Sequence, residues 1–143
     1  SLEGLRALNE AFGAAPGRTG RIRWVEGRIA WIEDGNCDRA LESFREAREL
    51  SPGSSRYRAW SAACLTELER WEEAEKDVTW LLERFPGDGK IRLMVARLYA
   101  GQGRTADAIA ELEIALGYWS EADANFRPAA EARELLTDLQ TAG

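Results

Sequence analysis

The side chains that could perform chemistry are mostly carboxylates, and their spacing does not assemble a catalytic site. Glu42 is followed at helical intervals by Arg45 and Glu46, and Glu67 by Arg70. Residues three or four positions apart are neighbours on a helix surface, so solvated charged faces explain these groups. The 143-residue chain has no histidine, which removes serine–histidine and cysteine–histidine nucleophile pairs and the commonest metal ligand. No glycine-rich phosphate loop occurs either. We therefore expect no catalytic residue, no cofactor, no metal site and no enzymatic activity.

The two cysteines are the remaining reactive groups. Cys37 and Cys64 lie far apart in the chain, and neither belongs to a CxxC pair. This arrangement supports neither a metal site nor a redox pair. The sequence favours two small thiols that are buried or half-buried.

Composition and charge narrow the class of partner. The chain is 45% hydrophobic and 31% charged, as an ordinary soluble globular protein is. Its 25 acidic and 19 basic residues leave a formal charge of -6, which argues against nucleic acid as the main partner. No run of about 18 apolar residues exists, so no membrane insertion is expected. Arginine outnumbers lysine 17 to 2, which indicates a GC-rich, bacterial genome.

The start of the chain bears on its origin. It begins Ser-Leu, lacks an initiator methionine and has no secretory signal. We expect a trimmed portion of a longer protein. Both a cytoplasmic and a periplasmic location therefore stay open, since neither excludes two unpaired cysteines.

A repeat of 34 residues organises the elements that must position any binding site. Small and large apolar residues recur at this interval, as close helix crossings require. The recurring positions are Ala40, Ala74 and Ala108, followed one turn later by Phe44, Val78 and Leu112. The repeats are 21–54, 55–88 and 89–122.

Each repeat is predicted to contain two helices, because apolar residues recur at helical spacing and glycine, asparagine or proline interrupts them. In the first repeat, Asp34-Gly35-Asn36 ends one helix and Ser51-Pro52-Gly53 ends the other. The later helices are expected near 55–68, 71–85, 89–100 and 105–117. Thr105 is the expected N-cap of the last of these. No segment has the alternating pattern of a strand.

The two ends of the chain are predicted to be helical as well. Gly4, Leu8, Ala11 and Pro16 have the spacing of Ala40, Phe44, Ala47 and Pro52, but the offset from Pro16 to Pro52 is 36, so the linker contains two inserted residues. Residues 2–13 are thus expected to be the second helix of a half repeat spanning 1–20. Pro128 suits a first helical turn, and an apolar stripe follows it in the segment 123–143. This capping helix completes an all-α single domain, 1–143, of about eight helices.

The first repeat resembles the tetratricopeptide repeat family in period, in helix pairing and in its key residues. Those residues are Trp24, Gly27, Trp31, Ala40, Phe44, Ala47 and Pro52. The resemblance covers 21–122 and implies a right-handed superhelical stack of antiparallel helix pairs. Arg28 departs from the pattern, since the family prefers a small residue there.

The resemblance also implies a concave groove, lined by the first helix of each repeat, that binds a peptide or a partner helix. The groove candidates are Ile22, Val25, Ile29 and Ile32, then Arg56, Ala59, Ala63 and Thr66, then Lys90, Leu93, Arg97 and Ala100. A groove of this composition suits a protein or peptide with aliphatic anchors and acidic groups. Alternatively, the four residues of the first group pack on the helix 2–13 and belong to the core.

One subclass of the family grips a C-terminal carboxylate of Hsp70- or Hsp90-type chaperones with Lys, Asn, Asn, Lys and Arg. The matching positions here hold Val25, Ile29, Trp60, Lys90 and Met94. Only Lys90 agrees, and one lysine cannot supply the convergent donors that hold a carboxylate. We predict no tight binding of such tails.

The six tryptophans mostly fall on expected core positions, but Trp80 does not. It occupies the position of Glu46 in the previous repeat and of Ile114 in the next one. Trp80 and Ile114 could form an apolar patch on the outer face, and such patches often mark interfaces. Alternatively, Trp80 lies flat on its own helix. Oligomerisation could use this face or the end helices.

Two functions fit these features. The first is a non-catalytic protein–protein interaction module, a scaffold or adaptor within a larger protein. The second is a dedicated chaperone or assembly factor that holds one client, in secretion or in cell-envelope assembly. Both would use the same groove, so the residues do not separate them.

Overall fold

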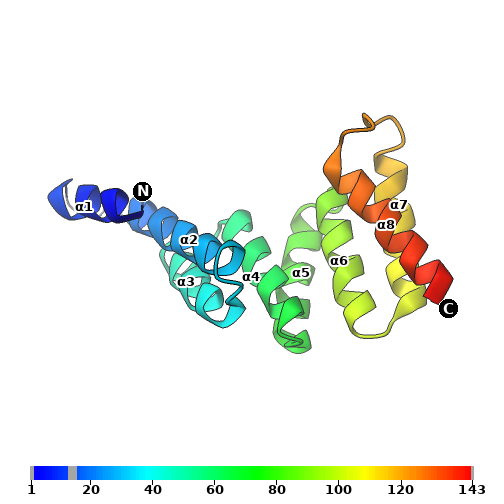
Figure 1. Ribbon diagram of the computed structural model, residues 1–143, viewed down its shortest axis with the longest axis horizontal. Coiled ribbons are helices and arrows are strands. Elements are labelled where there is room, and N and C mark those ends of the chain that lie inside the picture. Colours follow the sequence, from blue (N-terminus) through cyan, green and yellow to red (C-terminus); the bar gives the residue numbers. More distant parts are fainter. Residues whose placement is uncertain (1, 13–15, 143) are drawn as a thin grey trace. The chain divides into compact units, whose positions relative to one another are not determined.

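The computed structural model describes residues 2–12 and 16–142, and these residues form eight helices and no strand (Figure 1). The all-α prediction is therefore confirmed. The helices are α1 (Leu2–Phe12), α2 (Pro16–Ile32), α3 (Cys37–Leu50), α4 (Ser55–Glu67), α5 (Trp71–Arg84), α6 (Gly89–Gly101), α7 (Thr105–Tyr118) and α8 (Arg127–Ala142). Most of these bounds agree with the sequence prediction to within one or two residues.

The backbone groups into two compact units, residues 1–68 and residues 69–143. In the first unit, α2 packs against α1 and α3, and α3 packs against α4. In the second unit, α6 packs against α5 and α7, and α8 lies on α7 and α6. None of the described helices is both long and apolar enough to cross a membrane.

Close approach of α2 and α3 depends on small side chains. An alanine Cβ at Gly27 would lie 2.5 Å from Cε1 of Phe44, so only glycine leaves room for that ring. Ala40, Phe44 and Ala47 on α3 are all fully buried. In the second unit the matching residues Ala108, Leu112 and Ala115 are also fully buried, so the 34-residue pattern marks the core.

The turn between the two helices of each repeat uses one backbone conformation. Gly35 and Gly103 have φ values of 62° and 76°, in the left-handed region. The matching residue of the second repeat is Glu69, whose φ is 59°. Left-handed backbone is strained for a residue with a Cβ, so Glu69 is less favourable in this conformation than glycine would be.

Side-chain caps start several helices. The side chains of Asn36 and Ser54 accept hydrogen bonds from the backbone N–H of Arg39 and of Tyr57, and that of Asp88 accepts from two N–H groups of α6. The predicted cap at Thr105 is wrong by one residue. Thr105 is the first helical residue, and the cap position before it makes no side-chain hydrogen bond.

The prediction for the N-terminal segment is also corrected, at Pro16. α1 matches the expected helix 2–13, but residues 13–15 of the linker lie outside the described residues. Pro16 begins α2 and does not close a loop as Pro52 does. Proline favours a first helical position, because its φ is already helical and the missing N–H needs no partner there. As a result α2 has 17 residues, against 13 in α4 and in α6.

Candidate peptide-binding surface

The apolar residues of α2 pass from buried to exposed along the helix. Ile22 is buried, Val25 and Ile29 are half-buried, and Ile32 is 64% exposed. Ile22 and Val25 line a cavity of about 400 Å³ whose other apolar residues are Leu5 and Leu8 of α1. Contact with α1 therefore accounts for the start of the row, whereas Ile32 is exposed.

A cluster of aromatic rings lies beside this row, between α2, α3 and α4. Trp60 of α4 is at its centre, with ring centroids 6.3 Å from Trp24, 5.6 Å from Trp31 and 6.0 Å from Phe44. Tyr57 extends the cluster, 6.1 Å from Trp24. Edge-to-face and tilted contacts at these distances are favourable. The cluster fixes α4 on α2 and α3, and it explains Trp60, whose role the repeat pattern does not give.

Arg28 is inserted into the cluster. Its guanidinium carbon lies 4.8 Å from the ring centroid of Trp24 and 5.0 Å from that of Trp60. Arg56 of α4 lies over Trp24 as well, at 5.1 Å. Cation–π attraction at these distances holds both guanidinium groups in place. Arg28 thus fills the position where the family prefers a small residue by lying against indole rings.

Neither Arg28 nor Arg56 has an ion-pair partner among the described residues. Other arginines of the first unit do, since Arg6 and Arg23 both contact Glu26, at 2.8 and 3.0 Å. The Nε of Arg28 is also buried without a hydrogen-bond partner in this part of the chain. Stacking occupies the faces of a guanidinium and leaves its N–H groups, which lie in the plane, available to an acceptor.

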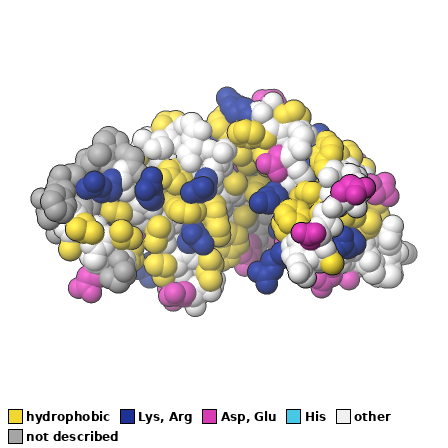
Figure 2. Space-filling model, turned by 90° about the horizontal axis from the view of Figure 1, so that it is seen from above, with side chains coloured by type: hydrophobic (Ala, Val, Ile, Leu, Met, Phe, Trp, Pro, Cys, Tyr) yellow, Lys and Arg dark blue, Asp and Glu magenta, His cyan; other side chains and the backbone are white. Residues whose placement is uncertain are grey.

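A shallow pocket on α2 combines this charge with the apolar row. Its volume is about 270 Å³, and its lining residues are Val25, Arg28, Ile29, Ile32 and Glu33. On the face shown in Figure 2, basic side chains lie among apolar ones over the first unit. We call Val25, Arg28, Ile29, Ile32 and Arg56 the α2/α4 surface.

Sequence reasoning missed Arg28 as a functional residue, although it named the other four members of this surface. The available signal was the spacing of Trp24 and Arg28, four residues apart on one helix face. The remaining α4 candidates of the first unit, Ala59, Ala63 and Thr66, are half-buried.

The groove candidates of the second unit are less uniform. Lys90 is exposed on α6, and Arg97 is exposed and pairs with Glu131 of α8 at 2.8 Å. The expectation that Leu93 lines a groove is wrong. Leu93 is 3% exposed and packs in a core cluster with Ala132 of α8, so the C-terminal helix covers it.

The outer-face residues of the second unit are only partly open. Trp80 is half-buried, and the guanidinium of Arg84, one turn later on α5, lies 3.8 Å from its ring centroid. Ile114 of α7 is exposed. A contact with its own helix accounts for Trp80, and the patch stays a prediction.

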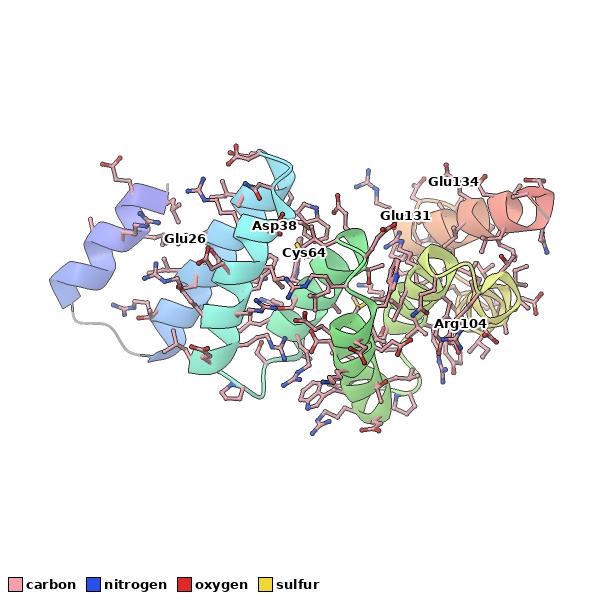
Figure 3. All side chains as sticks on the ribbon, turned by 90° about the horizontal axis from the view of Figure 1, so that it is seen from below. Glu26, Asp38, Cys64, Arg104, Glu131 and Glu134 are labelled. Carbon is pink, nitrogen blue, oxygen red and sulfur yellow. The ribbon has the colours of Figure 1, made fainter. Side chains whose placement is uncertain are left out.

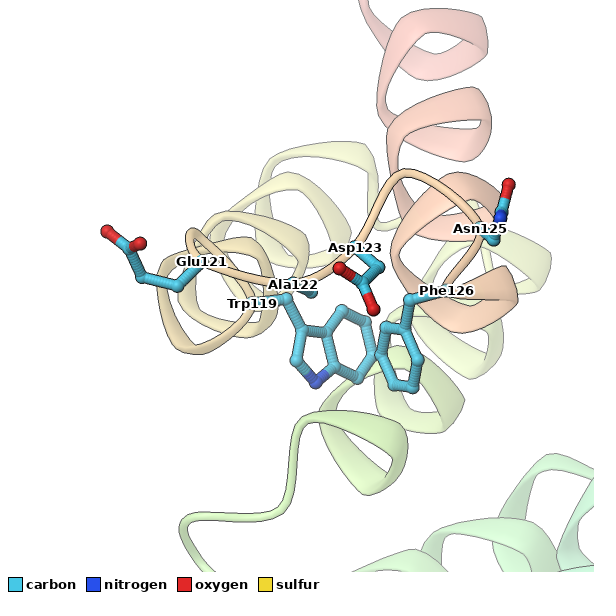
Figure 4. Close-up of a pocket in the computed structure, with 6 residues that line it drawn as sticks. All are labelled: Trp119, Glu121, Ala122, Asp123, Asn125 and Phe126. Atoms are coloured by element: carbon cyan, nitrogen blue, oxygen red, sulfur yellow. The ribbon is translucent and has the colours of Figure 1, made fainter.

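The loop between α7 and α8 contains an open pocket of about 530 Å³ (Figure 4). Trp119 and Phe126 line it with rings 5.3 Å apart, and Asp123 lies beside them. Trp119 also packs on the core cluster of α8, and an added Cβ at Gly89 would lie 2.6 Å from it. These contacts give Trp119 a structural role. The described residues include no group of three or more His, Cys, Asp or Glu side chains that could hold a metal ion.

Comparison with known families agrees with the repeat pattern. A family model described as tetratricopeptide repeat matches residues 32–88 and 65–125. The chain belongs to the tetratricopeptide repeat family. No curated protein sequence matches it. The recurring small and large residues of α3, α5 and α7 are thus those of tetratricopeptide repeats.

Solved structures of other tetratricopeptide repeats share the fold at low sequence identity. The OM64 domain of Arabidopsis is 20% identical with a TM-score of 0.68, covering 85% of this chain and 97% of its own. PcrH of Pseudomonas aeruginosa is 19% identical with a TM-score of 0.72, and the match covers 85% of this chain and 92% of PcrH. The first repeat domain of Spaghetti (RPAP3), solved with the HSP90 peptide SRMEEVD, is 16% identical with a TM-score of 0.69, covering 88% and 94%. At these identities the likeness shows the helical-repeat fold alone.

Proposed function

We propose that this tetratricopeptide repeat chain is a non-catalytic protein-interaction module that binds a peptide or partner helix on its α2/α4 surface. The bound segment carries aliphatic side chains and at least one carboxylate. Family membership supports the general role, and one similar repeat structure was solved with a peptide bound. The chemistry that we propose for the bound segment depends on the α2/α4 surface.

The observation that carries the proposal is the pair Arg28 and Arg56. Both guanidinium groups lie over the ring of Trp24, and neither has a carboxylate partner among the described residues. An immobilised arginine loses little entropy when it binds, and its planar N–H groups match the geometry of a carboxylate. Arg28 and Arg56 outnumber Glu33, the carboxylate that lines the same pocket, so this surface would attract an acidic segment although the chain as a whole is acidic.

Aliphatic contacts would supply the remaining affinity. Ile32 is exposed, Ile29 is half-buried, and both line the pocket that contains Arg28. Protein surfaces usually recognise a helix or an extended peptide by burying its apolar side chains beside an anchored charge. A ligand with two or more Leu, Ile or Val side chains within a few residues of a carboxylate matches this surface.

Selection from a phage-displayed random peptide library tests the proposal, with the wild-type chain as bait. We expect the enriched peptides to combine acidic and aliphatic residues. Their affinities for Arg28→Met, which keeps an unbranched apolar stem but loses the charge, should fall by about tenfold or more, as loss of a charge-assisted hydrogen bond implies. Ile32→Glu should abolish binding by placing a carboxylate beside the ligand.

Matched control variants separate binding from folding. Arg39→Met removes an exposed arginine from α3, and Ile114→Glu adds a carboxylate at an exposed isoleucine of α7. Both controls should bind the peptides as the wild type does. Unchanged affinity of Arg28→Met and Ile32→Glu would refute the proposal. A natural partner that stays in solution only while bound to the chain would identify a chaperone in place of a scaffold.

A further inference from the structure

The fold brings the two cysteines into contact. Their Sγ atoms lie 2.6 Å apart, although 27 residues separate them in the chain. Both thiols are free and buried, Cys37 with 4% of its surface exposed and Cys64 with none. The expectation of buried thiols is therefore confirmed, but the spacing along the chain hid a pair in space.

The pair joins two helices of different repeats. Cys37 is the first residue of α3, directly after the Asn36 cap, and Cys64 lies one turn before the end of α4. Figure 3 shows Cys64 near Asp38, where α4 packs against the start of α3. Repeat packing sets this juxtaposition, and neither side chain extends into solvent.

The surroundings of the pair keep both sulfurs protonated at neutral pH. Burial raises the pKa of Cys64 to about 11. The pKa of Cys37 is raised further, first by burial, then by Cys64 and by the carboxylate of Glu67, whose Oε2 lies 3.4 Å from the Cys37 sulfur. Neutral thiols exchange slowly, because the thiolate is the nucleophile.

We propose that Cys37 and Cys64 form a disulfide site that cross-links α3 to α4, with a small-molecule or protein disulfide as oxidant. Cys37, the more exposed of the two, attacks the oxidant's disulfide after passing its proton to solvent or to Glu67. A mixed disulfide forms, and one oxidant thiol leaves. Cys64 then attacks the Cys37 sulfur and displaces the second oxidant thiol. Two protein thiols are oxidised to one disulfide, and the oxidant's disulfide is reduced to two thiols.

The bond would fix the packing beneath the aromatic cluster. α3 contributes Phe44 to that cluster and α4 contributes Trp60, with ring centroids 6.0 Å apart. A cross-link between these helices limits how far they can separate in the unfolded chain and in partial unfolding. This inference does not depend on the proposed peptide ligand.

Incubation of the native wild-type chain with oxidised glutathione tests the site directly. After quenching with acid, thiols are titrated in denaturant and the intact mass is measured. We expect both free thiols to disappear and the mass of most molecules to fall by two hydrogen atoms, with glutathione adduct as a minor product. The ratio of internal disulfide to adduct should be about tenfold or more higher for native protein than for urea-unfolded protein, because the fold holds the sulfurs together.

Single variants provide the controls. Cys37→Ser and Cys64→Ser can form only an adduct, so any internal disulfide signal must vanish in both. The oxidised wild type should unfold at a higher urea concentration than the reduced form, and dithiothreitol should reverse the shift. The proposal would be overturned if the thiols stayed free or if adducts formed without an internal disulfide. It would also be overturned if the ratio of internal disulfide to adduct were no higher for native protein than for unfolded protein.

Discussion

The contact between Gly27 and Phe44 makes one prediction that can be worked through in detail. Gly27→Ala adds a single methyl group at the point where α2 meets α3. Its Cβ would lie 2.5 Å from Cε1 and 2.7 Å from Cδ1 of Phe44. Carbon atoms in contact sit about 3.5–4.0 Å apart, so the ring or the helix must shift by about 1 Å. Phe44 is fully buried, so a shift of its ring disturbs the residues packed around it.

Two opposing terms set the magnitude of this change. Overpacking a buried contact costs about 1–3 kcal/mol. Replacing glycine by alanine inside a helix returns about 0.5–1 kcal/mol, because the unfolded chain loses freedom. We expect Gly27→Ala to lower the free energy of unfolding by about 0.5–2 kcal/mol.

The same helix offers a matched control at Gly20. An added Cβ there would meet its three nearest atoms at 3.6 Å, an ordinary contact distance. Gly20→Ala should therefore raise the free energy of unfolding by about 0.5–1 kcal/mol. Since the helix term is common to both variants, the difference between them isolates the packing term.

Urea unfolding followed by far-ultraviolet circular dichroism measures both variants, with the slope on urea checked for constancy. A second substitution, Phe44→Leu, should cost less in the Gly27→Ala background than in the wild type, because the smaller side chain relieves the clash. Equal stability of the two alanine variants would refute the reasoning, as would the absence of coupling to Phe44.

Three further predictions concern the turns, the ion pairs and the excluded ligand. Glu69→Gly should raise the free energy of unfolding by about 1 kcal/mol in urea, because it relieves left-handed backbone; a decrease would show that the Glu69 side chain is required. Arg92→Ala should cost about 1–3 kcal/mol, because it leaves the half-buried Glu111 carboxylate, now 3.1 Å away, unpaired. Arg97→Ala, at an exposed pair, should cost less than about 1 kcal/mol, and equal losses would contradict this ranking. Fluorescence anisotropy with a labelled SRMEEVD peptide should show no micromolar binding, because Lys90 alone remains of the family's carboxylate clamp.

Much of the fold follows from residue spacing alone. The period of 34 residues identified Ala40, Ala74 and Ala108, and all three are fully buried. The prediction from spacing succeeds because each repeat buries the same small positions against its neighbours, so small residues recur in the sequence at the repeat interval. Glycine at 35 and at 103 also marked turns correctly, since few other residues adopt that backbone.

The features that spacing did not reveal depend on side chains that meet across helices. Arg28 is a departure from the family pattern, and its place between Trp24 and Trp60 depends on the rotamers of residues on two helices. Leu93 looked like a groove residue because periodicity gives its helix face, but not which face the last helix covers. The cysteine contact was hidden for the same reason, since distance along the chain does not report distance between α3 and α4.

The central claim is that ligands bind at the α2/α4 surface, and the indole N–H signals of the tryptophans test it most directly. A ¹⁵N-labelled chain would be titrated with a peptide selected for binding, and the indole signals would be assigned by single Trp→Phe variants. We predict that the signals of Trp24 and Trp60 shift in a saturable manner, while those of Trp71, Trp80 and Trp119 stay in place. Shifts confined to the latter three, with Trp24 and Trp60 unchanged, would contradict the account.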